Sequence, residues 1–218
     1  MKILFISLGC DKNLADSEEM LGLLTGNGHE IVDSEEEADA IVINTCCFIH
    51  DAKEESVNTI LEMAEYKKTG TCKILIVTGC MAQRYKEEIT EEIPEVDAVL
   101  GTTSYGDIVK ALNEAEAGHV FQEFKDINAL PEDSGRRVIT TGGHFGYLKI
   151  AEGCDKHCTY CIIPSLRGKF RSVPEERLLK QAEYMASQGV RELILVAQET
   201  TVYGTDLYGK KTLHILLK

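Results

Sequence analysis

The sequence predicts an α/β protein, with a doubly wound parallel sheet in its amino-terminal part and a smaller α/β unit behind it. Short apolar runs alternate with segments of helical spacing over residues 1–121. The runs are nearly continuous, which is typical of parallel strands that helices cover on both faces. Of the 218 residues, 44% are hydrophobic and 27% are charged. This composition is close to that of globular domains, and the chain is long enough to build a core without disulfides.

Each predicted element follows from its local pattern. The predicted strands are apolar runs bounded by polar turns, and they cover Lys2–Ser7, Glu30–Val32, Ala40–Asn44, Lys73–Thr78 and Asp97–Leu100. The predicted helices carry apolar residues at helical spacing, and the first of them closes at a glycine, as helix ends often do. These helices cover Asp16–Asn27, Asp51–Tyr66, Ala82–Glu92 and Ser104–Ala117.

Residues 122–144 interrupt this alternation, and we interpret them as a linker. They contain Pro131, Gly135 and the pair Gly142-Gly143, with a short strand expected at Val138–Thr141. A second unit follows at 145–218, with a strand at Phe145–Ala151, a helix at Pro174–Gln188 and a strand at Glu192–Ala197. One βαβ repeat of this size cannot bury its own sheet, so we expect this unit to be incomplete. The predicted domains are therefore 1–121 and 145–218.

The chain is acidic. Its 23 Lys and Arg residues against 36 Asp and Glu give a formal net charge of −13. Binding of nucleic acid across the chain needs clustered positive charge, so this balance argues against it and permits a basic protein partner. No apolar run reaches the roughly 18 residues of a membrane span, and the N-terminus lacks the cleavage site of a signal peptide. We therefore expect a cytoplasmic protein.

Eight cysteines need a chemical explanation, because stable disulfides are rare in a reducing compartment. Three of them, the loop trio, form the motif Cys154-Asp-Lys-His-Cys158-Thr-Tyr-Cys161. This spacing is too tight for one face of a helix and indicates a loop wrapped around a cofactor. A structural zinc would need a fourth ligand, such as His157 or a distant cysteine. Three thiolates on a four-iron cluster leave one iron open to a substrate, and we favour this interpretation.

A second set, the strand-end trio, is dispersed along the chain. Cys10, Cys46 and Cys80 each follow a predicted parallel strand. Since the carboxyl ends of such strands meet at the ligand-binding edge of a sheet, we expect these thiols to meet in space. The alternative is that they are small buried hydrophobes, the commonest fate of a free cysteine. Their position in turns beside glycine or threonine favours a second three-thiolate site.

Other residues have no decisive pattern. We expect Cys47 to be a spare small residue and Cys72 to be exposed. The basic residues after the loop trio either bind an anionic ligand or are solvated; they are Arg167, Lys169 and Arg171. Gln198-Glu199-Thr200 ends the last predicted strand, where (β/α) barrels place catalytic groups, or it caps a helix.

Together these motifs resemble the radical S-adenosylmethionine (SAM) methylthiotransferases. The segment Cys154–Cys161, with Ile162-Ile163-Pro164 behind it, looks like the cluster loop of that superfamily. Ser7-Leu8-Gly9-Cys10, Asn44-Thr45-Cys46 and Thr78-Gly79-Cys80 look like the family's amino-terminal domain. The resemblance covers essentially all 218 residues and implies that the second unit is the start of a truncated radical SAM partial barrel.

The resemblance implies two 4Fe–4S clusters and SAM as cofactors. The loop trio would hold the cluster that cleaves SAM to an organic radical, and the strand-end trio would hold an auxiliary cluster that presents a methylated sulfur. It also implies that Tyr160, Gln198 and Glu199 contact the bound cofactor. No catalytic residue is expected beyond the cluster ligands. A flavodoxin- or ferredoxin-type protein would supply the electrons.

Within the family, Ser7–Asn13 followed by Asp16-Ser17-Glu18 is more similar to the branch that modifies a ribosomal protein. Asp11 and Glu199 differ from the Pro and Asp that are usual there. The implied reaction adds a methylthio group to the β-carbon of an aspartate in a small-subunit ribosomal protein. The alternatives are a tRNA-adenosine methylthiotransferase and a cysteine-rich zinc-binding or electron-transfer protein. Family members are about twice as long, so we expect this chain alone to be inactive.

Overall fold

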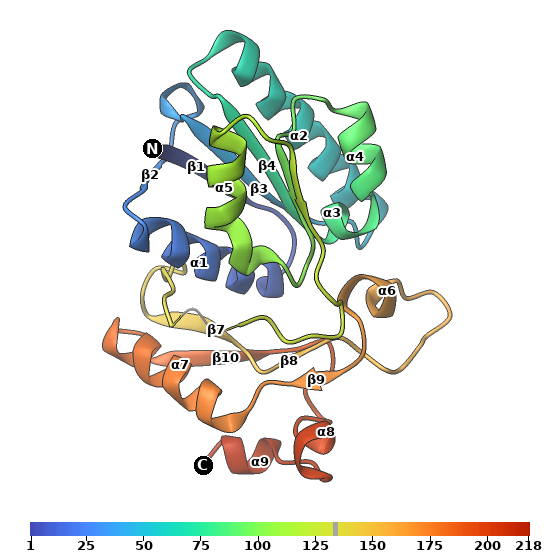
Figure 1. Cartoon of the computed structure of the whole chain (residues 1–218). Helices are drawn as coiled ribbons and strands as arrows, with labels where there is room; N and C mark the ends of the chain where they lie inside the picture. The colour runs from blue at the N-terminus through green and yellow to red at the C-terminus, as the bar shows by residue number, and fades with distance from the viewer. Residues whose placement is uncertain (133–134) are drawn as a thin grey trace.

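Six parallel strands form the sheet of the amino-terminal domain, which confirms the predicted fold class (Figure 1). The computed structural model describes residues 1–132 and 135–218. The strand order is β2-β1-β3-β4-β5-β6, so the chain winds one way from β1 to β2 and the other way from β3 onward. The strands are β1 (Lys2–Ser7), β2 (Glu30–Val32), β3 (Ala40–Thr45), β4 (Ile74–Gly79), β5 (Ala98–Leu100) and β6 (Phe121–Glu123).

Helices cover both faces of this sheet. Along β3, Ile41 and Ile43 belong to one hydrophobic cluster and Ala40 and Val42 to the other, because successive side chains of a strand point to opposite faces. Both faces are therefore buried, which explains the nearly continuous apolar runs of the sequence. The first cluster is covered by α2 (His50–Thr69), α3 (Cys80–Arg84) and α4 (Lys86–Glu92), and the second by α1 (Asp11–Gly26) and α5 (Ile108–Glu116).

Most predicted boundaries agree with the structure to within a few residues. The helix expected over Ala82–Glu92 is an exception, because it consists of α3 and α4, which are separated at Tyr85 (φ −122°, ψ 36°). The first helix starts earlier than expected, directly after Cys10. Two 3-10 turns, η1 (Glu35–Glu37) and η2 (Tyr105–Asp107), complete this domain, and η2 leads into α5.

The segment expected to be a linker makes contacts with the amino-terminal domain. Its first residues belong to β6, so the sheet extends into this segment. The strand expected at Val138–Thr141 is wrong. The amide of Val138 donates instead to the Glu18 carbonyl at 3.0 Å, and the amide of Thr140 donates to the Glu18 carboxylate at 2.7 Å. Residues 133–134 of the expected linker lie outside the described part of the chain.

The second unit contains one βαβ repeat, below the first domain in Figure 1. Its strands β7 and β10 are parallel neighbours, and a short antiparallel pair, β8 and β9, lies beside them. The strand expected at Phe145–Ala151 is thus divided at Ile150 between β7 and β8. The elements are β7 (Phe145–Lys149), β8 (Ala151–Glu152), α6 (Ile163–Arg167), β9 (Arg171–Ser172), α7 (Glu175–Ser187), β10 (Glu192–Val196), α8 (Thr205–Tyr208) and α9 (Leu213–Leu216). Over residues 1–132 and 135–218, the structure contains no helix long and apolar enough to cross a membrane.

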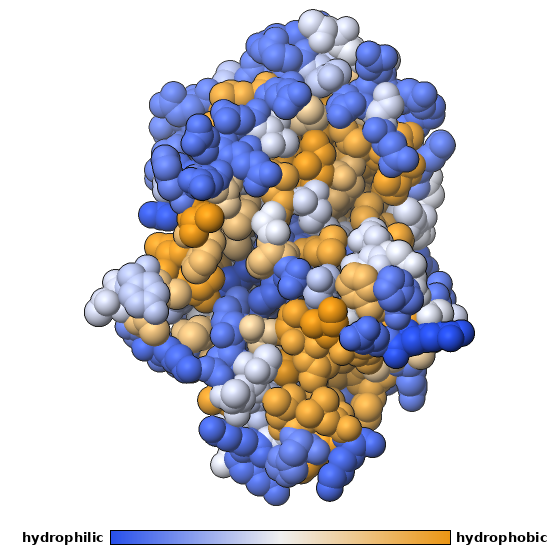
Figure 2. All heavy atoms as spheres, turned by 180° about the vertical axis from the view of Figure 1, so that it is seen from behind, coloured by the Kyte–Doolittle hydropathy of each residue, from blue (hydrophilic) through white to orange (hydrophobic). Residues whose placement is uncertain are grey.

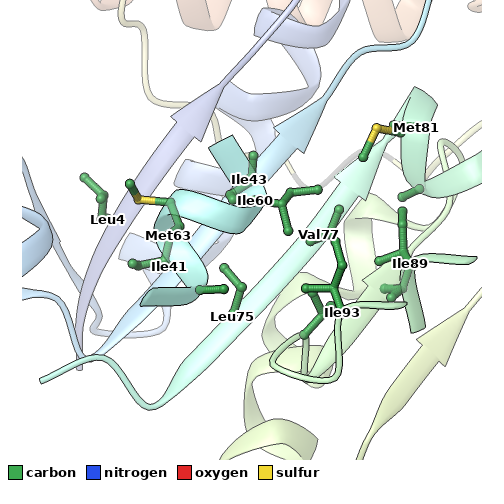
Figure 3. Packing of buried hydrophobic residues seen from close by; sticks show 14 of the residues in the cluster. Leu4, Ile41, Ile43, Ile60, Met63, Leu75, Val77, Met81, Ile89 and Ile93 are labelled. Atoms are coloured by element: carbon green, nitrogen blue, oxygen red, sulfur yellow. The ribbon is translucent and has the colours of Figure 1, made fainter. Parts of the chain in front are cut away.

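The central strands should contribute most to stability. Figure 3 shows Ile41 within the cluster between the sheet and α2, where its side chain is fully buried. Ile41→Ala should lower the free energy of unfolding by about 2–5 kcal/mol, because it removes apolar contacts and leaves a cavity. Leu61→Ala on α2 is the control: this side chain is 48% exposed, so its loss should cost under about 1 kcal/mol. Urea denaturation followed by circular dichroism measures both, and equal losses would contradict this packing.

Candidate functional site

The strand-end trio lies where three neighbouring strands of the sheet end. β1, β3 and β4 are adjacent and parallel. Their carboxyl ends are in register, since Ser7 pairs with Asn44 and Thr45 pairs with Gly79. The three cysteines follow these ends at one edge of the sheet, as the sequence predicts, and they line the same cavity.

Glycines shape the backbone immediately before two of these cysteines. Gly9 and Gly79 both have φ of +94°, a conformation that other residues rarely adopt. A Cβ on Gly9 would lie 2.7 Å from the Cβ of Cys46, and one on Gly79 would lie 2.5 Å from the Thr45 carbonyl oxygen. The absence of a side chain at these two glycines therefore allows the neighbouring strand ends, and the thiols they carry, to approach closely.

Buried polar side chains hold these turns in place. The Ser56 hydroxyl on α2 donates to the Cys46 carbonyl at 2.8 Å and accepts from the Cys46 amide at 3.0 Å. The Asn13 side-chain amide donates to the carbonyls of Leu8 and Thr45 at 3.0 and 2.9 Å, and so links the turns after β1 and β3. Its oxygen lies 3.9 Å from the Cys80 Sγ. The strand-end trio is thus supported by a fixed shell of hydrogen bonds.

The loop trio lies in an irregular loop, as its spacing predicts. Between β8 and α6 the chain forms neither helix nor strand. Gly153 has φ of +71°, and a Cβ there would lie 2.5 Å from the Gly168 carbonyl oxygen. His157, in the middle of the loop, also has a left-handed backbone (φ +44°). The Cys154 amide donates to the Gly168 carbonyl at 3.1 Å, which anchors the base of the loop.

Both trios line one cavity of about 700 Å³. This volume lies within the roughly 300–1,000 Å³ that is typical of small-molecule sites. Figure 2 shows the face opposite to that of Figure 1, with a hollow between the two units in which hydrophilic and hydrophobic residues meet. Besides the six cysteines, the cavity walls include the polar residues Lys12, Arg167, Gln198 and Glu199 and the apolar residues Phe48, Ile49 and Leu195.

A buried ion network joins the two units beside this cavity; it consists of Lys12, Asp16, Lys149, Glu152 and Arg167. Asp16 on α1 accepts from Arg167 at 2.8 Å and also pairs with Lys149. Glu152 pairs with Lys149 at 2.9 Å and with Lys12 at 3.0 Å. Each member is at most 7% exposed. Every charge in the network has an opposite charge beside it, so the network can stay ionised away from water.

The pKa values reflect this pairing. Burial opposes the charge of Lys149, but the carboxylates of Asp16 and Glu152 outweigh it and raise the pKa of Lys149 well above its usual range. Burial likewise opposes ionisation of Glu152, and the three neighbouring cations hold its pKa well below the usual range. Burial lowers the pKa of Lys12 to about 8, against the attraction of Glu152.

Lys12, near the strand-end trio, forms hydrogen bonds with three residues of the second unit. Its ammonium donates to the Ala151 carbonyl at 3.0 Å, to the Glu152 carboxylate at 3.0 Å and to the Gln198 side-chain oxygen at 2.5 Å. Lys12 follows the first cysteine of the strand-end trio by two positions, and Glu152 precedes the first cysteine of the loop trio by two. This salt bridge therefore connects the chain segments that carry the two cysteine sets.

The residues expected to contact the cofactor differ in their surroundings. Gln198 and Glu199 line the cavity. Glu199 pairs with Lys156 and accepts from Thr201, and these partners lower the pKa of Glu199 to about 2. Tyr160 is 90% exposed and lies outside the cavity walls. Cofactor binding by these three residues stays a prediction.

The three basic residues after the loop trio have separate environments. Arg167 is buried in the ion network, Lys169 is exposed, and Arg171 donates to the backbone carbonyls of Arg167 and Lys169. Of the three, Arg167 lines the cavity. Burial raises the pKa of Cys80, and the Arg167 guanidinium beside it opposes that rise.

The two remaining cysteines are buried. Cys72, expected to be exposed, is 3% exposed, because the turn before β4 folds its side chain into the core. Cys47 is 3% exposed and packs in the same cluster. Burial raises the pKa of Cys47 to about 11, so this thiol stays protonated at neutral pH. Neither residue lines the cavity.

Sequence reasoning missed most of the ion network. Lys12 and Asp16 lie on a helix, and Lys149 and Glu152 on short strands, where single charged residues usually indicate a solvated face. Asn13 was missed for the same reason, since a lone polar residue in a helix gives no sign of its partners. Proximity in sequence to the predicted cysteine ligands is the signal that could have identified Lys12, Asn13 and Glu152.

The donor set fits iron–sulfur clusters. Thiolates are their usual ligands, and the cavity is lined by three thiols from each unit. Among residues 1–132 and 135–218, no group of three or more His, Cys, Asp or Glu side chains is arranged to hold one metal ion. Ligands of a single zinc must converge on one point, about 2.3 Å from each sulfur. Thiolates of a four-iron cluster bind different irons, so they need not converge on one point.

Comparison with known families gives two matches. Residues 2–101 match the family described as "Uncharacterized protein family UPF0004", and residues 148–217 match the radical SAM superfamily. The first match contains the strand-end trio, and the second contains the loop trio.

Curated relatives extend the similarity over the whole chain. The ribosomal protein uS12 methylthiotransferase RimO of Lachnoclostridium phytofermentans is 66% identical over 218 residues, which are 100% of this chain and 50% of that protein. Proteins of the same name from Clostridioides difficile and Clostridium botulinum (strain Eklund 17B) are 51% and 52% identical, over 100% of this chain and 49% of theirs. These matches confirm the resemblance to the radical SAM methylthiotransferase family. The chain spans about half the length of the curated relatives it matches.

The ion network should make a large contribution to stability. Asp16→Asn should lower the free energy of unfolding by about 3–5 kcal/mol, because it leaves buried cations short of negative charge. Glu65→Gln is the control, since Glu65 forms an exposed pair with Lys68 on α2 and its loss should cost under about 1 kcal/mol. Urea denaturation of both variants tests this. A loss for Asp16→Asn as small as the control's would mean that water screens the network.

The network should also give a defined pH dependence. Because the folded-state pKa of Glu152 is lowered, its stabilisation is fully present above the ordinary Glu value of about 4.3 and is lost as the pH falls through the lower folded value. The difference in unfolding free energy between the wild type and Glu152→Gln should therefore be constant from about pH 7 to about pH 5 and shrink below about pH 4. Urea midpoints across this range measure it, and a difference that grows on acidification would refute the assignment.

Proposed function

We propose that the protein containing this chain is a radical SAM methylthiotransferase that modifies ribosomal protein uS12, at the β-carbon of an aspartate. The observation that carries the proposal is the single cavity lined by two cysteine trios, one from each unit. The relatives named as uS12 methylthiotransferases support the substrate. The expectation that the 218 residues alone are inactive stays a prediction.

Each trio supplies the ligands for one cofactor. The thiols of the loop trio would hold one 4Fe–4S cluster, and those of the strand-end trio would hold a second. Three protein ligands leave one iron of each cluster free to bind another molecule. When bound, the clusters and SAM supply the electron, the organic radical and the sulfur, while the protein supplies binding and orientation.

The chain's own residues orient this chemistry. The Lys12–Glu152 bridge connects the segments that carry the two trios, and Gln198, which accepts a hydrogen bond from Lys12, lies at the cavity wall. The apolar residues Phe48, Ile49 and Leu195 also line the cavity and would offer apolar surface to a bound cofactor. The ion pair with Lys156 keeps the Glu199 carboxylate ionised. This carboxylate would contact a polar group of SAM at the rim of the cavity.

The charge of the chain suits the proposed partner. A formal net charge of −13 favours association with a basic ribosomal protein over binding of tRNA phosphates. A flavodoxin- or ferredoxin-type protein would deliver electrons. A ribosomal substrate assigns the reaction to the cytoplasm.

The function is tested in a strain that lacks the gene for the whole protein. Mass spectrometry of ribosomal protein uS12 should show loss of the methylthio group from one aspartate, and the intact gene should restore it. Methylthioadenosine in tRNA, measured in the same cells, should be unchanged. An unaltered uS12 with loss of the tRNA modification would replace this proposal by the tRNA-directed activity.

The cluster ligands are tested by counting iron. After anaerobic reconstitution with iron and sulfide, the wild-type chain should hold about eight irons, and replacing either trio by Ala should remove about four. The double variant Cys47→Ala/Cys72→Ala is the control and should keep all of them, because neither thiol lines the cavity. A colourless chain that binds one or two zinc ions would instead identify a zinc-binding protein.

A further inference from the structure

We propose that Arg167, which belongs to the second unit, is a positioning residue for the strand-end trio of the first: its guanidinium compensates negative charge at Cys80 and raises the reduction potential of a cluster held there. This inference rests on the proposed function, because it assumes a cluster on the strand-end trio. The inference adds that a residue of the second unit changes the reduction potential of the cluster held by the first unit.

The geometry brings Arg167 to the trio from outside its domain. Arg167 ends α6, and the residue before it, Leu166, packs in the same hydrophobic cluster as Cys80 and Met81. Both Arg167 and Cys80 line the cavity. One guanidinium nitrogen donates to the Asn13 side-chain oxygen at 2.5 Å, and that oxygen lies 3.9 Å from the Cys80 Sγ.

The hydrogen bonds of Arg167 explain why arginine suits this position. Its guanidinium donates to Asp16 at 2.8 Å and reaches Glu152 at 3.4 Å, in addition to Asn13. A planar guanidinium can serve several acceptors in a fixed orientation, whereas a lysine ammonium is a point charge on a flexible chain. The side chain is 3% exposed, so water can do little to screen its charge from the thiols.

The sign of the effect follows from charge. Reduction adds an electron, and a buried cation beside a cluster stabilises the more negative, reduced state. Removing the cation should therefore lower the reduction potential. Because Arg167 reaches Cys80 only through the packing of α6 on the first domain, the potential would also report whether the two units are docked.

The experiment uses the 218-residue chain in which the loop trio is replaced by Ala, so that any remaining cluster belongs to the strand-end trio. After anaerobic reconstitution, iron is counted and the midpoint potential is measured by a redox titration followed by electron paramagnetic resonance. Arg167→Gln should lower the midpoint by at least about 59 mV, a tenfold change in the oxidised-to-reduced ratio. Arg167→Lys, which keeps the charge, should shift it by less than half as much.

Arg171→Gln is the matched control, since Arg171 is on the same segment but donates to the carbonyls of Arg167 and Lys169; its midpoint should be unchanged. Because Arg167→Gln leaves Asp16 short of a cation, Arg167→Gln/Asp16→Asn is measured as well. This double variant removes one charge of each sign, so it should be more stable than Arg167→Gln. Its midpoint potential is compared with that of Asp16→Asn, which keeps Arg167, and should still be lower.

The outcomes separate the two proposals. Four irons with the lowered midpoint in Arg167→Gln and in the double variant would support the inference. Four irons with an unchanged midpoint would overturn it and leave the proposed function intact. A parent chain that takes up no iron would overturn the auxiliary cluster, and the role of Arg167 with it.

Discussion

The buried ion network between the two units is the constraint on which the site depends. Two carboxylates and three cations are removed from water at this interface. A buried ion without its partner costs several kcal/mol, so the five groups are tolerated only in the arrangement that pairs them all. The βαβ repeat of the second unit is too small to bury its own sheet, and packing against α1 covers it. The pairing requirement then selects one relative position for the two units.

Stability by itself does not explain why charged residues occupy this interface. Apolar residues of similar volume often stabilise a protein as well as a buried ion pair does, or better. The placement of the network suggests another reason. The Lys12–Glu152 bridge joins a residue two positions after Cys10 to a residue two positions before Cys154. Polar contacts are directional, unlike apolar ones, so they fix the distance between the trios more closely than an apolar interface would.

The sequence predicts much of the fold and both cysteine sets, because each rests on a local rule. Apolar runs between helical segments predict parallel strands, and parallel strands bring the residues that follow them to one edge. Cys10, Cys46 and Cys80 could thus be grouped although up to 70 residues separate them. The loop trio could be identified from the spacing of its three cysteines alone. The path of Val138–Thr141 depends on tertiary contacts with Glu18, and no local pattern in the sequence reveals it or the helix break at Tyr85.

The ion network could not be predicted for a related reason: no single charged residue in the sequence indicates which residue it will pair with. Asp16 alone predicts a solvated helix face, and Arg167 alone is equally consistent with a solvated loop. Their pairing spans 151 residues and requires that both units be folded and docked. The cofactor ligands are thus specified by strands and loops within each unit, whereas the contacts that orient them arise between the units. It follows that a single substitution in the network can leave the ligands of each unit intact and still disturb the site, because the network is one of the contacts that position the thiols of one unit relative to those of the other.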